Sequence, residues 1–113
     1  MAELSKHAQD KVEQLRKDYI SSLPNKITQI EASWSKVKQG ANNKNLKELA
    51  RLSHKFSGSA GAYGLISFAK ALQDLEASCN QSISAGIEQD AALKQTKPYY
   101  DVMKNIVNSE LYD

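Results

Sequence analysis

Residues 52–65 of the chain read LSHKFSGSAGAYGL, and this stretch joins the end of one expected helix to the beginning of another. The helix that leads into it begins near Asn43, which could cap it, and its small and apolar residues recur every three or four positions. Gly61 and Gly64 break or bend the chain, and the helix that follows has the same periodicity. The first of these helices runs through Leu46, Leu49, Ala50, Ser53, Phe56, Ser57 and Ala60. The residues that we expect the second to bury are Leu65, Phe68, Ala69, Leu72, Leu75 and Cys79.

Two further helices are expected before this pair. The first runs from about Glu3 to Ile20 and has a narrow apolar stripe. The segment SSLP at residues 21–24 then predicts a stop and a restart, because serine is a good N-cap and proline is tolerated in a first helical turn. The second helix ends near Gly40, where glycine and asparagines indicate a turn. The stripe residues are Leu4, Ala8, Val12, Leu15 and Tyr19 in the first helix and Ile27, Ile30, Trp34 and Val37 in the second.

A final helix is expected after a polar loop at about Ser82 to Gly86. Pro98 lies inside its pattern, and the sequence does not decide whether this proline kinks or breaks the helix. Tyr63, in the glycine-flanked bend, is either a core residue or a partner contact. The apolar residues of the final helix are Leu93, Tyr99, Met103, Ile106 and Leu111, and the aromatic residues assigned to the core are Trp34, Phe56, Phe68 and Tyr99.

These helices predict an all-α fold, an antiparallel four-helix bundle with an additional N-terminal helix. We expect one domain over residues 1–113, with the core bundle at about 22–110 and the N-terminal helix at about 3–20. A chain of 113 residues with 41% hydrophobic content suits one domain and has no room for two.

The charge and the cysteine content restrict the classes of function. The 15 basic residues nearly balance the 13 acidic ones, and a formal charge of +2 is too small to argue for nucleic-acid binding. The only cysteine, Cys79, cannot form an internal disulfide, which suits a reducing compartment. No apolar run has the character of a signal peptide or the length of a membrane span. We therefore expect a soluble cytoplasmic protein whose function involves neither nucleic acid nor a membrane.

The candidate reactive group is His54, at the edge of the solvent face of its helix. Lys47, Arg51, His54 and Gly58 form one stripe at spacings of four, three and four residues. A neutral imidazole is a competent nucleophile near neutral pH, and histidine forms covalent intermediates in catalysis. Gly58 leaves space through which a partner's active site could approach the imidazole, although glycine inside a helix costs about 1 kcal/mol relative to alanine.

Charged residues near His54 suit a phosphoryl group on the imidazole. Arg51 and Lys55 could screen the charge of roughly −2 that phosphorylation adds. Glu76 lies on the next helix, on the face beside its apolar stripe. A carboxylate there could accept the Nδ1–H of His54, which would fix the tautomer and leave Nε2 free to attack.

The stretch at residues 52–65 resembles the signature of histidine phosphotransfer (HPt) domains from multistep phosphorelays. In that family the phosphoacceptor histidine precedes a Gly-Ser-Ala element and a Gly-Leu pair opens the next helix; this chain has His54, Gly58-Ser59-Ala60 and Gly64-Leu65. The family also places a Gln or Glu twenty-two residues after the histidine, hydrogen-bonded to its ring, and that position here is Glu76. The resemblance is sharp over about thirty residues and rests on helix pattern and length elsewhere.

One position departs from the family pattern. Many members have a lysine three residues after the histidine, where its charge neutralises the phosphoryl group, and this chain has Ser57 there. A second form of the signature places the lysine directly after the histidine, and Lys55 fits that form. The sequence therefore leaves open whether Lys55 or Arg51 neutralises the phosphoryl group.

The resemblance implies a phosphocarrier rather than an enzyme. Phospho-His54 would relay a phosphoryl group between receiver-domain aspartates, or from a sensor kinase to a response regulator. The implied partners are response regulators or other receiver domains and a sensor (hybrid) histidine kinase, and the carrier is expected to be a monomer. The resemblance also implies no ATP site, no metal site and no cofactor of its own, with magnesium on the partner receiver domain. The chain has neither a Walker-type loop nor a kinase glycine loop.

Two other functions are weighed against the carrier. The chain could be an interaction module that binds receiver domains without transferring phosphate, which the absence of the usual lysine would suit. A metal-binding or enzymatic bundle is disfavoured, because no Glu-x-x-His or His-x-x-x-His pair occurs in the sequence.

An apolar partner surface beside His54 would have to come from the second helix or the tyrosine bend. The donor and the acceptor stay open, and Met1 favours a free-standing protein over a fragment of a larger kinase.

Overall fold

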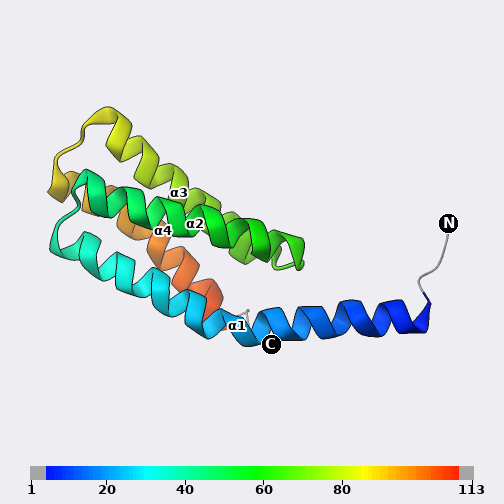
Figure 1. The fold of residues 1–113 in the computed structure, drawn as a ribbon. Coiled ribbons are helices and arrows are strands. Elements are labelled where there is room, and N and C mark those ends of the chain that lie inside the picture. The colour runs from blue at the N-terminus through cyan, green and yellow to red at the C-terminus, as the bar shows by residue number, and fades with distance from the viewer. Residues whose placement is uncertain (1–4, 110–113) are drawn as a thin grey trace.

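Four α-helices form the part of the chain that this computed structural model describes, residues 5–109. They are α1 (Lys6–Gln39), α2 (Asn43–Ala62), α3 (Ile66–Ala85) and α4 (Gln89–Ser109), and there is no strand within the described range. The C-terminal half of α1 lies beside the other three helices, whereas its N-terminal half projects beyond them (Figure 1). The radius of gyration, 16.2 Å, exceeds the roughly 13 Å typical of a compact domain of this length because of that projection. The expected all-helical fold is confirmed.

The expected additional N-terminal helix and the restart at residues 21–24 are wrong, because both segments belong to α1. Pro24 lies inside this helix, which changes direction where its projecting half meets its packed half (Figure 1). The hydroxyl of Ser21 donates to the carbonyl of Lys17 at 3.0 Å instead of capping a new helix. Packing explains the continuity: Leu23 and Ile27, on either side of the proline, are both buried in the core. Burial thus outweighs the local preference for a break.

Smaller differences concern the helix ends. Asn42 rather than Asn43 caps α2, and its side chain accepts from the backbone N–H of Asn45 at 2.9 Å. Helix α3 continues through the segment that was expected to be a polar loop, since Ser82 is buried within it. The helix ends at Gly86, whose φ of 61° is in the left-handed region that favours glycine. Helix α4 passes through Pro98 without a break. Glu3, Leu4 and Leu111 lie outside the described residues.

The core is built from apolar residues of all four helices, and most of the residues predicted for it are buried. Trp34, Phe56 and Phe68 are confirmed as core residues. Tyr99 is not: its exposed fraction is 43%, and its neighbour Tyr100 is the buried one. The ring of Tyr100 stacks on Trp34 with centroids 4.5 Å apart. Adjacent tyrosines on a helix point about 100° apart, so the packing of α4 against α1 selects between them.

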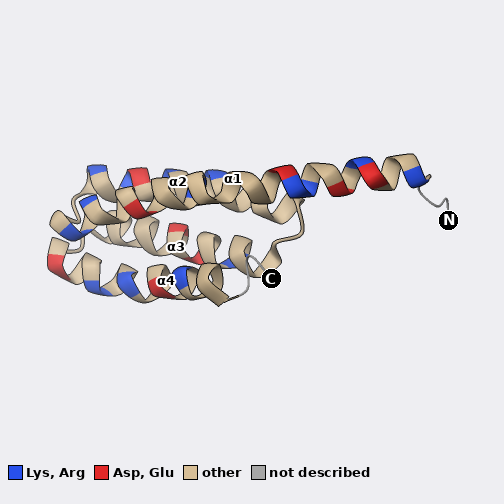
Figure 2. Ribbon diagram, turned by 90° about the horizontal axis from the view of Figure 1, so that it is seen from below, with Lys and Arg blue, Asp and Glu red and all other residues tan. Residues whose placement is uncertain are grey.

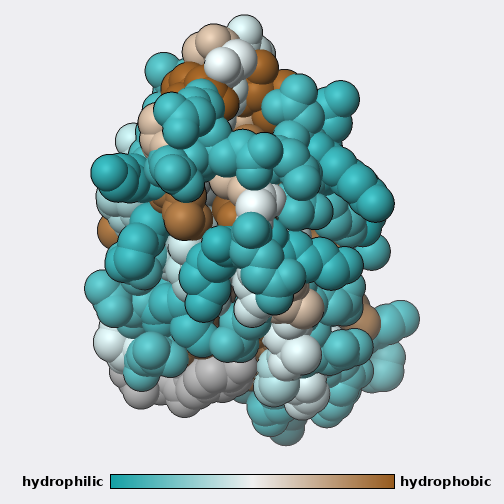
Figure 3. All heavy atoms as spheres, turned by 90° about the vertical axis from the view of Figure 1, so that its left-hand side faces the viewer, coloured by the Kyte–Doolittle hydropathy of each residue, from teal (hydrophilic) through white to brown (hydrophobic). Residues whose placement is uncertain are grey.

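The surface is mainly polar. Basic and acidic residues are interspersed along α1 and α4 (Figure 2), whereas the charged residues of α2 are basic except for Glu48. The end that carries the α1–α2 and α3–α4 connections is largely hydrophilic, and its apolar residues are scattered (Figure 3). Over residues 5–109, none of the helices combines the length and the apolar character that crossing a membrane requires.

Candidate functional site

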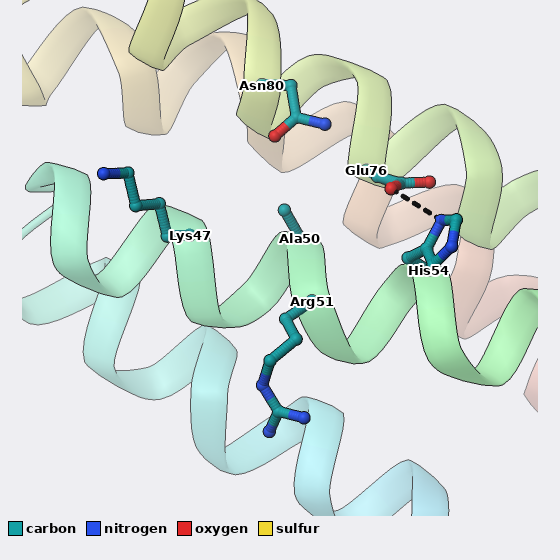
Figure 4. Close-up of a pocket in the computed structure, with 6 residues that line it drawn as sticks. All are labelled: Lys47, Ala50, Arg51, His54, Glu76 and Asn80. Atoms are coloured by element: carbon teal, nitrogen blue, oxygen red, sulfur yellow. Dashed lines mark ion pairs between the residues drawn. The ribbon is translucent and has the colours of Figure 1, made fainter.

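His54 lies on the outer edge of α2, where its imidazole meets a carboxylate from α3. The Nδ1 atom of His54 is 2.9 Å from Oε2 of Glu76 (Figure 4). The buried face of α2, which includes Leu49 and Phe56, turns His54 toward solvent. The short connection after Tyr63 folds α3 back along α2, which brings Glu76 opposite the histidine.

This contact defines the chemistry of the imidazole. An ionised carboxylate can only accept a hydrogen bond, so Nδ1 carries the hydrogen and donates it to Glu76. In the neutral ring, Nε2 then holds the free lone pair. The side chain of His54 is 76% exposed, whereas that of Glu76 is 24% exposed. The site therefore combines a partly buried carboxylate with an imidazole that contacts it through Nδ1 and whose side chain is mostly exposed.

Gly58 leaves open space one turn after His54. A Cβ atom added at Gly58 would meet nothing within 4 Å among the described atoms outside its own helix backbone, so internal packing does not require glycine here. A side chain at this position would instead stand on the same stripe as the imidazole. Gly58 therefore lies on an open part of the α2 surface, on the same stripe as His54.

Ser57 has a local structural contact. Its side chain is buried, and its hydroxyl donates to the backbone carbonyl of His54 at 2.9 Å. A hydroxyl engaged in this way is directed along the helix backbone rather than toward the exposed Nε2 of His54.

The cations predicted near His54 make their contacts with other residues. Arg51 makes two hydrogen bonds to Glu48, Nε to Oε2 at 2.9 Å and the terminal nitrogen to Oε1 at 2.6 Å. The hydrogen bond from Arg51 is the main reason that the pKa of Glu48 is lowered, and it also raises the pKa of Arg51. The Nζ of Lys55 lies 5.7 Å from the ring centroid of Phe56. Neither cation has a contact with the imidazole among the interactions of the described residues.

A shallow pocket of about 310 Å³ extends from His54 along the groove between α2 and α3. Arg51 points away from the imidazole and toward α1, and Lys47 lies at the opposite end of the pocket (Figure 4). Asn80, one turn after Glu76, was not expected at this site, although its spacing of four from Glu76 places both on one face of α3. The residues that line the pocket are Lys47, Ala50, Arg51, His54, Glu76 and Asn80.

No apolar patch surrounds His54 on α2. The large hydrophobic residues that are exposed within the described range are Val12, Leu15, Ile66, Tyr99 and Val102. Tyr63 is partly buried against the core, and its ring stacks on Tyr19 at 4.5 Å. The hydroxyl of Tyr19 is hydrogen-bonded to that of Ser59 at 2.8 Å. These contacts attach the tyrosine bend to α1.

Within the described residues, no group of three or more His, Cys, Asp or Glu side chains could hold a metal ion.

Comparison with protein families places this site in context. The family model of the Hpt domain matches residues 14–107, which include His54, Glu76 and most of the four helices. Comparison with curated proteins and with solved structures finds no match. Because the family model covers most of the chain, the protein belongs to the Hpt domain family.

Proposed function

We propose that this protein relays a phosphoryl group through His54, between receiver-domain aspartates or from a sensor kinase to a response regulator. Hpt domains act in phosphoryl transfer within two-component phosphorelays, as carriers rather than kinases, and they interact with receiver domains and histidine kinases. The observation that carries the proposal is the contact between Nδ1 of His54 and Glu76, made by a His54 side chain that is 76% exposed. The carrier is proposed to act as a cytoplasmic monomer.

The reactive group that this chain contributes to the proposed transfer is the lone pair of the imidazole. Nε2 attacks the phosphorus of an aspartyl phosphate, the N–P bond forms, and the aspartate leaves as a carboxylate with the electrons of the broken P–O bond. The ring keeps its Nδ1–H and becomes positively charged, and Glu76 offsets that charge across the 2.9 Å contact. The reverse sequence passes the group to a second aspartate. Magnesium and the groups that activate the aspartyl phosphate are expected on the receiver.

A transfer assay tests this proposal. The protein is incubated with a phosphorylated receiver domain and magnesium, and the label on it is tested for acid lability and alkali stability. We expect an alkali-stable, acid-labile label that is lost in His54→Gln. His7→Gln is the matched control, because His7 is also exposed but lies on the projecting half of α1. Label that persists in His54→Gln, or no phosphohistidine with any of several receivers, would overturn the carrier function.

An interaction module that binds receivers without transfer is the second candidate. It is favoured by one observation, namely that Arg51 is paired with Glu48 rather than lying beside the imidazole. The two functions differ in one measurement. Receiver binding that is detected by calorimetry without any phosphoryl transfer would support the module, whereas transfer within the lifetime of the complex would exclude it.

A further inference from the structure

The ion pair between Arg51 and Glu48 is exposed to solvent. The side chains are 59% and 45% exposed, and the two residues are three positions apart on α2. Exposed ion pairs of this kind contribute little to stability, because solvent screens them and two long side chains must be held in one geometry. The pair therefore holds the guanidinium weakly, and a stronger anion nearby can displace Glu48.

Arg51 is also a close neighbour of His54. Residues three apart on a helix lie side by side on its surface. The two residues line the same pocket. The guanidinium now points away from the imidazole (Figure 4). A long side chain in solvent can change its rotamer without movement of the backbone.

The other positions of α2 around His54 do not offer an equivalent cation. Ser57 occupies the position three residues after it, with a hydroxyl bonded to the backbone. Lys55 follows His54 directly, so it projects about 100° away around the helix. Lys47 is seven residues before His54, at the far end of the pocket (Figure 4). Arg51 is thus the nearest cation on the stripe of α2 that carries His54.

We propose that Arg51 exchanges Glu48 for the phosphoryl group once His54 is phosphorylated, so that Glu48 holds the phosphate-binding arginine aside in the free protein. This inference rests on the proposed carrier function. A phosphoryl group has about −2 charge and three strong acceptor oxygens, against a single charge on the carboxylate. The planar guanidinium can bind two of those oxygens at once, as it now binds the two oxygens of Glu48. The exchange replaces the bidentate contact of Arg51 with the Glu48 carboxylate by a stronger bidentate contact with the phosphoryl group.

The equilibrium of phosphoryl transfer tests the exchange. Phosphorylated receiver and protein are mixed with magnesium, and the ratio of phospho-His54 to phospho-aspartate is measured once it is constant. We expect Arg51→Gln to lower this ratio about threefold to tenfold and Glu48→Gln to raise it about twofold to fivefold, as expected for solvent-exposed charged contacts. Lys97→Gln and Asp101→Asn are matched controls. They break an exposed pair with a 2.7 Å contact on α4 and change the net charge equally, and we expect them to leave the ratio unchanged.

The double variant separates the exchange from simple charge repulsion. If Glu48 acts only by holding Arg51, then Glu48→Gln has no effect in the Arg51→Gln background. An undiminished effect there would overturn the inference, as would a ratio in Arg51→Gln equal to that of the wild type. Arg51→Lys should restore part of the ratio, because it keeps the charge and loses the bidentate geometry.

A spectroscopic measurement follows the guanidinium directly. The Nε–Hε resonance of Arg51 should shift when His54 is phosphorylated by phosphoramidate, a small phosphoryl donor that needs no protein partner. An unchanged resonance on a fully phosphorylated protein would overturn the exchange and leave the carrier function standing. Failure of wild-type His54 to take up phosphate from either donor would overturn the carrier function and this inference together.

Discussion

The imidazole of His54 is oriented by a residue that is distant in the chain, since Glu76 belongs to the following helix. Replacing Glu76 with alanine removes the acceptor for Nδ1–H, so the neutral ring can place its hydrogen on Nε2 and lose the nucleophilic lone pair at the exposed position. We expect Glu76→Ala to lower the rate constant of transfer roughly tenfold or more, the size of effect seen for other groups that orient imidazoles. Rapid-quench measurement with a phosphorylated receiver gives this rate constant.

Glu76→Gln is the control for that prediction. Its amide oxygen can still accept from Nδ1 but carries no charge, so it should keep the tautomer and lose the electrostatic support of the charged ring. We expect a smaller loss than with alanine. Nitrogen-15 shifts of His54 report the tautomer separately from the rate. Equal rate constants in the wild type and Glu76→Ala would show that the contact does not contribute to transfer.

Ser53, the residue before His54, has a buried hydroxyl without a hydrogen-bond partner among the described residues. A buried polar group without a partner destabilises a fold, and alanine is also the better helix former. We expect Ser53→Ala to raise the free energy of unfolding by about 0.5–1 kcal/mol. Urea titration measures it, with Ser57→Ala as the matched control because that change removes a formed hydrogen bond. A loss of stability in Ser53→Ala equal to that in Ser57→Ala would contradict the prediction.

At the scale of the helix, α1 consists of two parts with different roles. Its C-terminal part buries Leu23 in the core, whereas Val12 and Leu15 on its projecting part are 57% and 46% exposed. Substitution of a buried leucine by alanine leaves a cavity, whereas an exposed side chain loses few contacts. We expect Leu23→Ala to lower the free energy of unfolding by about 2–5 kcal/mol, and Val12→Ala or Leu15→Ala to change it by about 0.5 kcal/mol or less.

Urea unfolding of these three variants gives the comparison, with circular dichroism to check their helix content. A loss above about 1 kcal/mol in Val12→Ala or Leu15→Ala would mean that the projecting half of α1 is covered in solution. Repeating the titration at several protein concentrations would then distinguish contacts within the chain from contacts between copies.

At the scale of the whole molecule, the closed core makes stability sensitive to alkaline pH. Burial raises the pKa of the Cys79 thiol to about 12 and that of the Tyr100 hydroxyl to about 12. Both groups ionise more easily in the unfolded chain, so the unfolded state gains relative stability as the pH rises above their ordinary values of 9.0 and 10.0 toward 12. We expect the contribution of these two groups to the free energy of unfolding to be constant near pH 7. It should decrease from about pH 9 upward.

Urea titrations between pH 7 and pH 11 measure this dependence. Cys79→Ala should make the fall shallower, because it removes one of the two groups, and its own cavity affects all pH values alike. An alkaline slope that is unchanged in Cys79→Ala would show that the thiol does not titrate with unfolding.

Much of the fold could be predicted from periodicity, and the failures share a cause. The stripes of α2 and α3 are long and regular, so their buried faces and the exposed edge at His54 followed from sequence spacing alone. The break at residues 21–24 and the choice between Tyr99 and Tyr100 depended on neighbours from other helices. The local sequence preference for ending a helix, or for burying one face of it, is weak in free energy compared with the burial of a large side chain such as Leu23.

The candidate site likewise depends partly on sequence spacing and partly on the packing of helices. The amino-acid order alone placed His54, Gly58 and Arg51 on one stripe of one helix, because spacing along a regular helix defines its faces. Only the tertiary structure brought Nδ1 of His54 within 2.9 Å of Glu76, since that distance depends on how α3 is rotated and aligned against α2. The pair between Arg51 and Glu48 is local by contrast, because residues three apart on one helix are neighbours, and the structure decided only which rotamer of the long Arg51 side chain makes that contact.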